Sequence, residues 1–175
     1  MRTALLSRIQ RRIIAFNTLI GRGVAWLLAV LMVVMCVDVI LRKLFNLTAI
    51  WSQELEWHLF AAVFLLGAAW AFAEDRHVRV DLFYAKFSPR DRALVNMVGG
   101  ICFLIPWSAL LGYVSLGYAW ESWTMREGSP NPGGLPGLYV IKFCISLGMW
   151  MLMFQGIASV LGAYVQWRQP EVSDP

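Results

Sequence analysis

Four apolar stretches without a charged residue constrain what this sequence can fold into. They cover residues 23–37, 59–73, 93–120 and 143–167. A helix needs about 20 residues to cross the roughly 30 Å hydrocarbon core of a bilayer, so the shorter stretches must extend into their flanks. The third stretch is long and contains Pro106, where we expect the helix to tilt, protrude or kink. The predicted membrane spans are residues 23–42, 57–74, 93–120 and 139–164.

The composition agrees with a chain that lies mostly in lipid. Hydrophobic residues make up 59% of the 175 positions and charged residues 15%, against roughly 25% charged residues in an average soluble domain. So few polar groups cannot cover the surface of a soluble protein. The net charge of +4 is expected to face lipid headgroups, and no nucleic-acid partner is predicted. We therefore predict an all-α integral membrane protein in which residues 1–175 form one four-span domain.

The basic residues are unevenly divided between the two sides of these spans. Eleven flank the start of the first span, the second-to-third connection or the end of the fourth: Arg2, Arg8, Arg11, Arg12, Arg22, Arg76, Arg79, Lys86, Arg90, Arg92 and Arg168. Four lie on the other side: Arg42, Lys43, Arg126 and Lys142. Because basic residues accumulate on the cytoplasmic side of a membrane, we expect both termini in the cytoplasm.

The segment between the first two spans predicts a short amphipathic helix at the membrane surface, over residues 48–56. Apolar residues there alternate with a glutamine and two glutamates. Either Thr48 or Ser52 could cap the N-terminus of this helix. Such a helix serves as a simple interfacial anchor or as a bracket that packs on a partner subunit, and both interpretations remain open.

Asp38 is the one carboxylate inside a predicted span, which makes it a candidate functional residue because a charge in lipid is costly. Arg42 follows four residues later, the spacing that places two side chains on one helical face. A structural ion pair and a contact with a partner subunit both remain open for Asp38 and Arg42.

His58 and His77 suggest haem ligation, because small four-span subunits of respiratory enzymes sometimes bind haem through two histidines. These two lie 19 residues apart, about 28 Å along a helix, whereas axial ligands must meet at one iron. One chain cannot build that site, but a haem shared with another subunit stays open, so a haem or quinone anchor is the alternative function. The three cysteines have no paired spacing and indicate neither a disulfide framework nor a zinc site. We predict no catalytic, cofactor-binding or metal-binding residue; a structural phospholipid is left open.

The two longer connections differ in composition. Residues 74–84 mix acids and bases with apolar residues, which favours a folded turn over a flexible linker. Ser88 followed by Pro89 is a favourable start for the third span. Residues 128–137 contain three prolines and four glycines, which favours a series of turns without regular structure. This loop could only connect two spans or could present a shaped surface, and composition does not decide between the two.

The order of these features resembles a known family. The motifs are Trp51-Ser52-Gln53-Glu54-Leu55, Leu65-Leu66-Gly67-Ala68-Ala69, His77-Val78-Arg79-Val80-Asp81, Ser88-Pro89-Arg90, and Ser129-Pro130-Asn131-Pro132-Gly133-Gly134-Leu135-Pro136 followed by Ile141-Lys142. Over residues 38–156 the chain resembles the DctQ-like small membrane subunit of tripartite ATP-independent periplasmic (TRAP) transporters. It departs from that family at Gln53, where a second acid is frequent, near Trp57, where a basic residue is frequent, and at Asn131, where one branch more often has Asp.

The resemblance implies a subunit of the bacterial inner membrane that is not an enzyme. Such a subunit packs beside a large DctM-like membrane subunit, which holds the substrate and sodium sites, and a periplasmic DctP-like binding protein delivers the substrate, usually a small carboxylate. By the same resemblance, residues 129–136 face the binding protein. The candidate subunit contacts are Asp38, Arg42, Trp51 and Glu54 in the outer half and His77, Arg79 and Asp81 at the inner turn.

Overall fold

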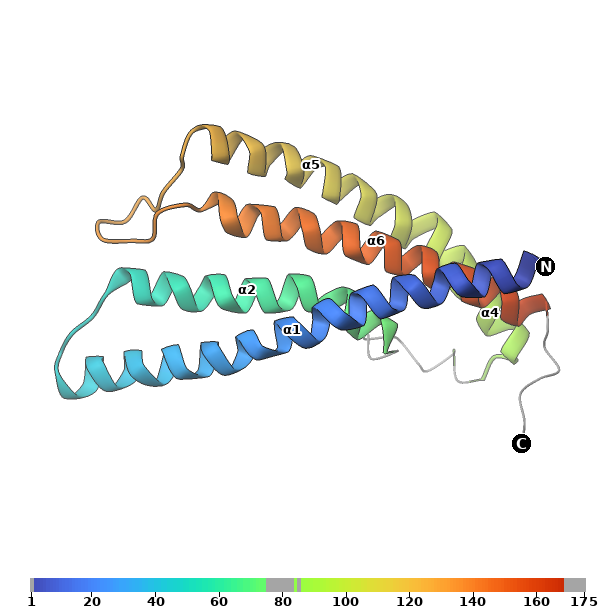
Figure 1. The fold of residues 1–175 in the computed structure, drawn as a ribbon, viewed down its shortest axis with the longest axis horizontal. Coiled ribbons are helices and arrows are strands. Elements are labelled where there is room, and N and C mark those ends of the chain that lie inside the picture. Colours follow the sequence, from blue (N-terminus) through green and yellow to red (C-terminus); the bar gives the residue numbers. More distant parts are fainter. Residues whose placement is uncertain (1, 75–83, 85, 169–175) are drawn as a thin grey trace.

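The computed structural model describes residues 2–74, 84 and 86–168, all of which are helices or their connections (Figure 1). The elements are α1 (Arg2–Leu44), α2 (Ile50–Ala73), α4 (Pro89–Gly99), the π-helical segment η1 (Gly100–Leu104), α5 (Ile105–Thr124) and α6 (Tyr139–Arg168). Four helices are long and apolar enough to cross a membrane, since α4, η1 and α5 form one continuous helix. The prediction of an all-α chain with four helices able to cross a membrane is thereby confirmed for the described residues.

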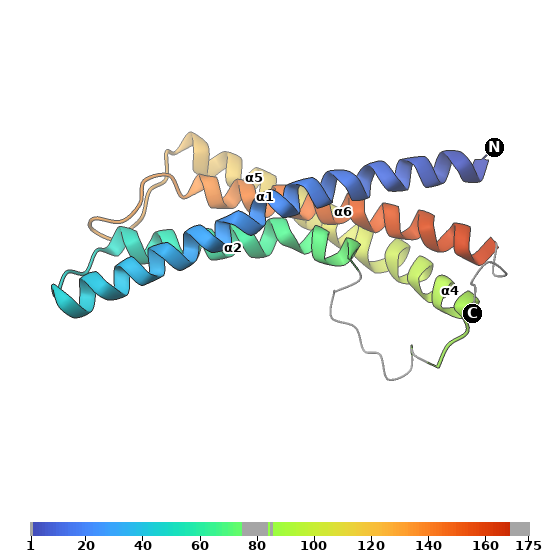
Figure 2. The ribbon, with the colours of Figure 1, turned by 60° about the horizontal axis from the view of Figure 1, so that its bottom comes forward.

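The helices form two hairpins, α1 with α2 and α5 with α6 (Figure 1). The connections 45–49 and 125–138 lie at one end, which we call the loop end. The start of α1, the start of α4 and the last turns of α6 lie at the opposite end, which we call the terminal end (Figure 2). Helix α6 contacts α1, α2, α4, η1 and α5, so it is the centre of the packing.

Helix α1 is much longer than the predicted span at 23–42. It has 43 residues and is about 64 Å long at 1.5 Å per residue, about twice the thickness of a hydrocarbon core. No proline interrupts residues 2–44, so the basic N-terminal segment continues the same helix. The two glycines at 21 and 23 do not end it, and Gly21 leaves room for the Trp70 ring of α2.

Helix α2 begins at Ile50, which corrects the prediction of a separate interfacial helix at residues 48–56. That stretch is described throughout, and from Ile50 onward it forms the first turns of the same helix that crosses the membrane. The N-cap is Ala49, without a side-chain hydrogen bond, so neither Thr48 nor Ser52 has the predicted capping role. The helix is continuous because residues 50–66 contain no glycine or proline to break it.

The predicted disturbance near Pro106 takes the form of a π-helical turn. Proline has no backbone N–H and cannot donate to the carbonyl four residues earlier. Just before it, the N–H of Ile105 donates to the carbonyl of Gly100, five residues back. The Ser108 hydroxyl donates to the carbonyl of Leu104, one turn earlier, at 2.5 Å. Ser88 caps the start of this helix, accepting from the N–H of Asp91 at 3.2 Å, with Pro89 in the first turn, as predicted.

The bundle interior contains small residues and a polar pair that joins the first helix to the last. Ala69 of α2 and Ala158 of α6 are fully buried, which lets the helices approach closely. Asn17 of α1 and Gln155 of α6, exposed by 0% and 2%, are joined by a hydrogen bond of 2.8 Å from the Asn17 amide to the Gln155 carbonyl oxygen. This buried bond ties the first helix to the last.

Candidate functional site

The carboxylate of Glu54, in the second turn of α2, holds the loop at residues 128–137. One oxygen accepts hydrogen bonds from the Ser129 hydroxyl and, at 3.0 Å, from the Asn131 amide. The other oxygen accepts from the backbone N–H of Leu135 at 2.7 Å. Three donors from one loop therefore converge on one side chain of another hairpin.

The loop closes on itself around this carboxylate. The N–H of Ser129 donates to the carbonyl of Leu135, and the N–H of Gly134 donates to the carbonyl of Asn131, each at 3.0 Å. Gly133 has a φ of +79°, a conformation that favours glycine. A Cβ on Gly134 would lie 2.7 Å from the Glu54 carboxylate, so glycine is required there for the close approach. The loop therefore has a defined shape, which composition alone did not indicate.

The exposed face of this loop consists of Gly128, Pro130, Asn131, Pro132, Gly133 and Pro136. Ser129, Gly134 and Leu135 are partly covered and face the Glu54 contact. The prolines restrict the backbone on the exposed side, while Glu54 holds the opposite side. The arrangement can present a fixed, largely uncharged surface at the loop end.

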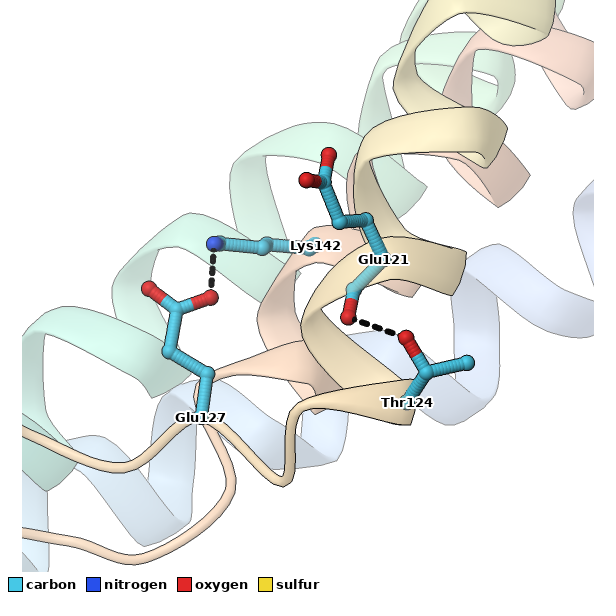
Figure 3. A network of polar contacts seen from close by, with 4 residues as sticks. All are labelled: Glu121, Thr124, Glu127 and Lys142. Atoms are coloured by element: carbon cyan, nitrogen blue, oxygen red, sulfur yellow. Dashed lines mark hydrogen bonds and ion pairs between the residues drawn. The ribbon is translucent and has the colours of Figure 1, made fainter.

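A second polar contact, between Glu127 and Lys142, lies beside the loop (Figure 3). Glu127 is near the start of the connection 125–138, and Lys142 is in the first turn of α6, just after it. The Lys142 ammonium donates to the Glu127 carboxylate and lies 3.9 Å from the centre of the Tyr118 ring. Lys142 is only 9% exposed, so the acid and the ring compensate its burial. The sequence did not predict this pair. The available signal was an acid and a base on opposite sides of one turn-rich loop.

The hydrogen bond from Lys142 lowers the pKa of the Glu127 carboxyl below its usual value. The contribution of the pair to stability is thus fully present above the pKa of Glu127 in the unfolded chain, and it is lost as the pH falls through the lowered folded value. We expect the difference in thermal unfolding temperature between the wild type and Glu127→Gln to be largest at pH 7 and to shrink at pH 3.

The control for this experiment is Glu121→Gln. Glu121 is near the pair, but only its backbone carbonyl takes part in the contact drawn, accepting from the Thr124 hydroxyl at 2.8 Å (Figure 3). Its substitution should change the unfolding temperature equally at both pH values. A Glu127→Gln effect of the same size at pH 7 and pH 3 would contradict the role of the ion pair.

Asp38 is held within the α1–α2 hairpin. It is 5% exposed, accepts a hydrogen bond of 2.9 Å from the Ser52 hydroxyl and forms an ion pair with Arg42 at 3.5 Å. The ion pair expected from the i, i+4 spacing is therefore present, and Ser52 is a partner that spacing did not reveal. Trp51, next to Ser52, is exposed at the loop end. The predicted contacts of Asp38, Arg42 and Trp51 with another subunit stay predictions.

Of the two histidines, only His58 lies among the described residues. His58 Nδ1 lies 2.5 Å from the backbone oxygen of Glu54, one turn earlier in α2. His77, Arg79 and Asp81 lie outside the described residues. Among the residues that are described, no group of three or more His, Cys, Asp or Glu side chains could hold a metal ion.

Comparison with protein families gives one match. Residues 31–165 match the family described as Tripartite ATP-independent periplasmic transporters, DctQ component. Neither the curated proteins nor the solved structures gave a match. The matched range covers most of the chain and includes all of α2, α4, η1 and α5 with most of α6. The chain therefore belongs to the DctQ family, the small permease component of TRAP transporters.

Proposed function

We propose that this chain is the non-catalytic scaffold subunit of a sodium-gradient-driven importer of a small carboxylate. It packs beside a large DctM-like subunit in the bacterial inner membrane and helps to dock a periplasmic DctP-like binding protein. The family match supports a role within a multi-component transporter. It gives no support to the alternative of a haem or quinone anchor.

The observation that carries this proposal is the hydrogen-bonded loop at residues 128–137. Glu54 accepts from Ser129, Asn131 and Leu135, so the surface is already ordered before a partner arrives. An ordered surface binds with a smaller loss of conformational entropy than a flexible loop. With both termini in the cytoplasm, this loop lies on the periplasmic side, where a binding protein can reach it.

Packing beside a large subunit is supported by the Asp38 contact and by apolar surface. Asp38 is 5% exposed and is paired inside the hairpin, so its own carboxylate is not exposed on the outer face of α1. Trp26 and Met32 of α1 are widely exposed, as are Phe103 of η1 and Tyr113 of α5. Such faces suit a neighbouring helix bundle as well as lipid chains.

The direct test is deletion of this chain from cells that keep the large subunit and the binding protein. We expect loss of sodium-dependent uptake of the carboxylate substrate, and co-purification of the two membrane subunits when both are expressed. Restoring the chain in trans should restore uptake. Normal sodium-driven uptake after the deletion would overturn the proposal.

The orientation is tested with single cysteines in a variant whose native Cys36, Cys102 and Cys144 are replaced by serine. We expect Pro132→Cys, at the loop end, to react with a membrane-impermeant maleimide added to spheroplasts. Leu5→Cys, exposed at the terminal end, should react only after the membrane is permeabilised. The opposite labelling pattern would reject cytoplasmic termini and, with them, the docking role of the loop.

A further inference from the structure

A groove of about 620 Å³ lies between α5 and α6, on the half of this hairpin nearer the loop end. The two helices pack side by side there (Figure 1), and both are long and apolar enough to cross a membrane. Leu116 of α5 and Val140 and Leu147 of α6 are exposed on its walls. The groove is therefore an open apolar feature on the surface of two membrane-spanning helices.

Packing between the helices fixes the inner wall of the groove. Trp150 of α6 lies against Gly112 of α5, where an added Cβ would be 3.2 Å from the nearest atoms of the Trp150 ring. Ser146 is 3% exposed, and its hydroxyl donates to the backbone oxygen of Gly112 at 2.9 Å. Because that hydroxyl already has an acceptor, the inner wall suits an apolar occupant such as an acyl chain.

Aromatic rings and a guanidinium group form the mouth of the groove. Trp123 of α5 and Tyr139 of α6 both lie on its walls and meet edge to face, with ring centres 4.7 Å apart. They lie at the ends of the two spans, where aromatic side chains commonly mark the boundary of the hydrocarbon core. The guanidinium carbon of Arg126 lies 4.8 Å from the centre of the Trp123 ring. A positive charge therefore lies beside the mouth, just outside the spans.

Arg126 occupies a backbone position that favours glycine. Its φ is +52°, its N–H donates to the carbonyl of Trp123 at 3.1 Å, and the N–H of Glu127 donates to the carbonyl of Ser122 at 3.0 Å. These two bonds form a Schellman motif, in which the residue with positive φ is usually glycine. Arginine destabilises such a turn relative to glycine. The turn is thus less stable with arginine, and this arginine lies over the ring at the mouth of the groove.

No acid neutralises this guanidinium group. No ion pair joins Arg126 to an acid in the part of the chain that the structure describes. Glu127, the next residue, is bound by Lys142 (Figure 3). Glu121 lies two positions before Trp123, about 200° around the helix, and so on the opposite side of α5. The charge of Arg126 is therefore available to an anionic group at the mouth.

We propose that the groove binds one phospholipid of the membrane leaflet at the loop end, with an acyl chain between α5 and α6 and the phosphate at Arg126. Guanidinium donors match phosphate oxygens in geometry and charge, and the volume is within the range of small-molecule sites. Two other mainly apolar cavities have an acid on their walls, Glu56 or Asp38, which opposes a phosphate there. The proposal does not depend on the transport role, because it concerns a site within this chain.

The headgroup contact is tested by native mass spectrometry of the purified, delipidated transporter complex. The probes are phosphatidylglycerol and a galactosyl diacylglycerol with the same acyl chains but no phosphate. We expect Arg126→Gln to weaken binding of phosphatidylglycerol about tenfold and to leave binding of the galactolipid unchanged. The control is Lys43→Gln, which removes a positive charge from an exposed side chain at the same end of the bundle. It should bind both lipids as the wild type does.

Arg126→Gly separates lipid binding from stability. Because glycine suits the positive φ, we expect the unfolding temperature in lipid-free detergent to stay unchanged or to rise. Binding of phosphatidylglycerol should fall as it does in Arg126→Gln. A lower unfolding temperature with unchanged binding would mean that Arg126 only stabilises the turn, and would overturn the proposal.

The acyl-chain contact is tested by filling the groove. Val140→Trp places a large ring in the groove from a position that is 57% exposed, so the helix packing stays intact, and it should weaken binding of both lipids. The matched control is Val114→Trp on α5, at a position that is 58% exposed and is not on the described walls of the groove. It should bind as the wild type does.

Each remaining outcome decides the proposal. Preference for phosphatidylglycerol that is lost in Arg126→Gln, together with loss of both lipids in Val140→Trp, supports it. Absence of lipid binding by the wild-type complex would mean that another occupant, such as the large subunit, covers the groove. That result, equal binding of the two lipids by the wild type, or equal losses in Val140→Trp and Val114→Trp would each overturn it.

Discussion

Replacing Glu54 with glutamine is expected to release the loop at residues 128–137 and to weaken docking of the binding protein about tenfold. The glutamine amino group cannot accept a hydrogen bond, so at least one of the three loop donors loses its acceptor. If the loop then holds its docking shape for about a tenth of the time, the apparent affinity falls about tenfold. Uptake in proteoliposomes, measured at limiting concentrations of binding protein, reports this change.

The control for Glu54→Gln is Glu56→Gln in the same helix turn. Glu56 makes no hydrogen bond to the loop in the part of the chain that the structure describes, and the substitution removes the same charge. Its uptake should match the wild type at all concentrations of binding protein. If uptake by the Glu54→Gln transporter also matches the wild type, the contact between Glu54 and the loop is not needed for docking of the binding protein.

Replacing Gly148 with alanine is expected to lower the free energy of unfolding by about 1–3 kcal/mol, as overpacking of a close contact does. The added Cβ on α6 would lie 2.6 Å from the backbone oxygen of Leu65 on α2. A backbone atom cannot rotate away as a flexible side chain can, so the two helices must separate. Thermal unfolding of the purified chain, followed by tryptophan fluorescence, measures the change.

Gly67→Ala provides the matched comparison on α2. A Cβ at that position would meet no atom within 4 Å, and alanine favours a helix over glycine by about 1 kcal/mol. The substitution should leave the unfolding temperature unchanged or raise it. Equal destabilisation by Gly67→Ala and Gly148→Ala would mean that the α2–α6 contact is not as close as the structure has it.

The fold was largely predictable because membrane spans depend on composition over a local window. A stretch without charges must be helical in lipid to satisfy its own backbone groups. The four predicted spans lie on the four long helices, and only the second span extends past its helix, by the single residue Glu74. Boundaries were less predictable. The predicted break between residues 56 and 57 does not exist, since amphipathic and fully apolar sequence can continue in one helix, and the basic segment before residue 23 is helical as well.

The candidate site was predictable only in part. The spacing of Asp38 and Arg42 is local, so their ion pair followed from helix geometry. The sequence selected Glu54 as a contact with another subunit, which stays a prediction. It did not reveal that the Glu54 carboxylate accepts hydrogen bonds from a loop 75 or more residues later in its own chain. The Asn131 side-chain amide donates to this carboxylate. An aspartate there could not donate unless protonated.

The sequence by itself determined that this chain is a four-helix membrane protein, because the cost of placing charge in lipid acts residue by residue along the chain. It also indicated the family, through motifs that follow one another along the chain. Only the tertiary structure decided which polar side chains far apart in the sequence pair with each other. Pairings such as Glu54 with Ser129, Lys142 with Glu127 and Asn17 with Gln155 depend on which helix faces lie opposite each other. That choice depends on long-range packing around α6, where small residues such as Gly148 allow backbones to approach.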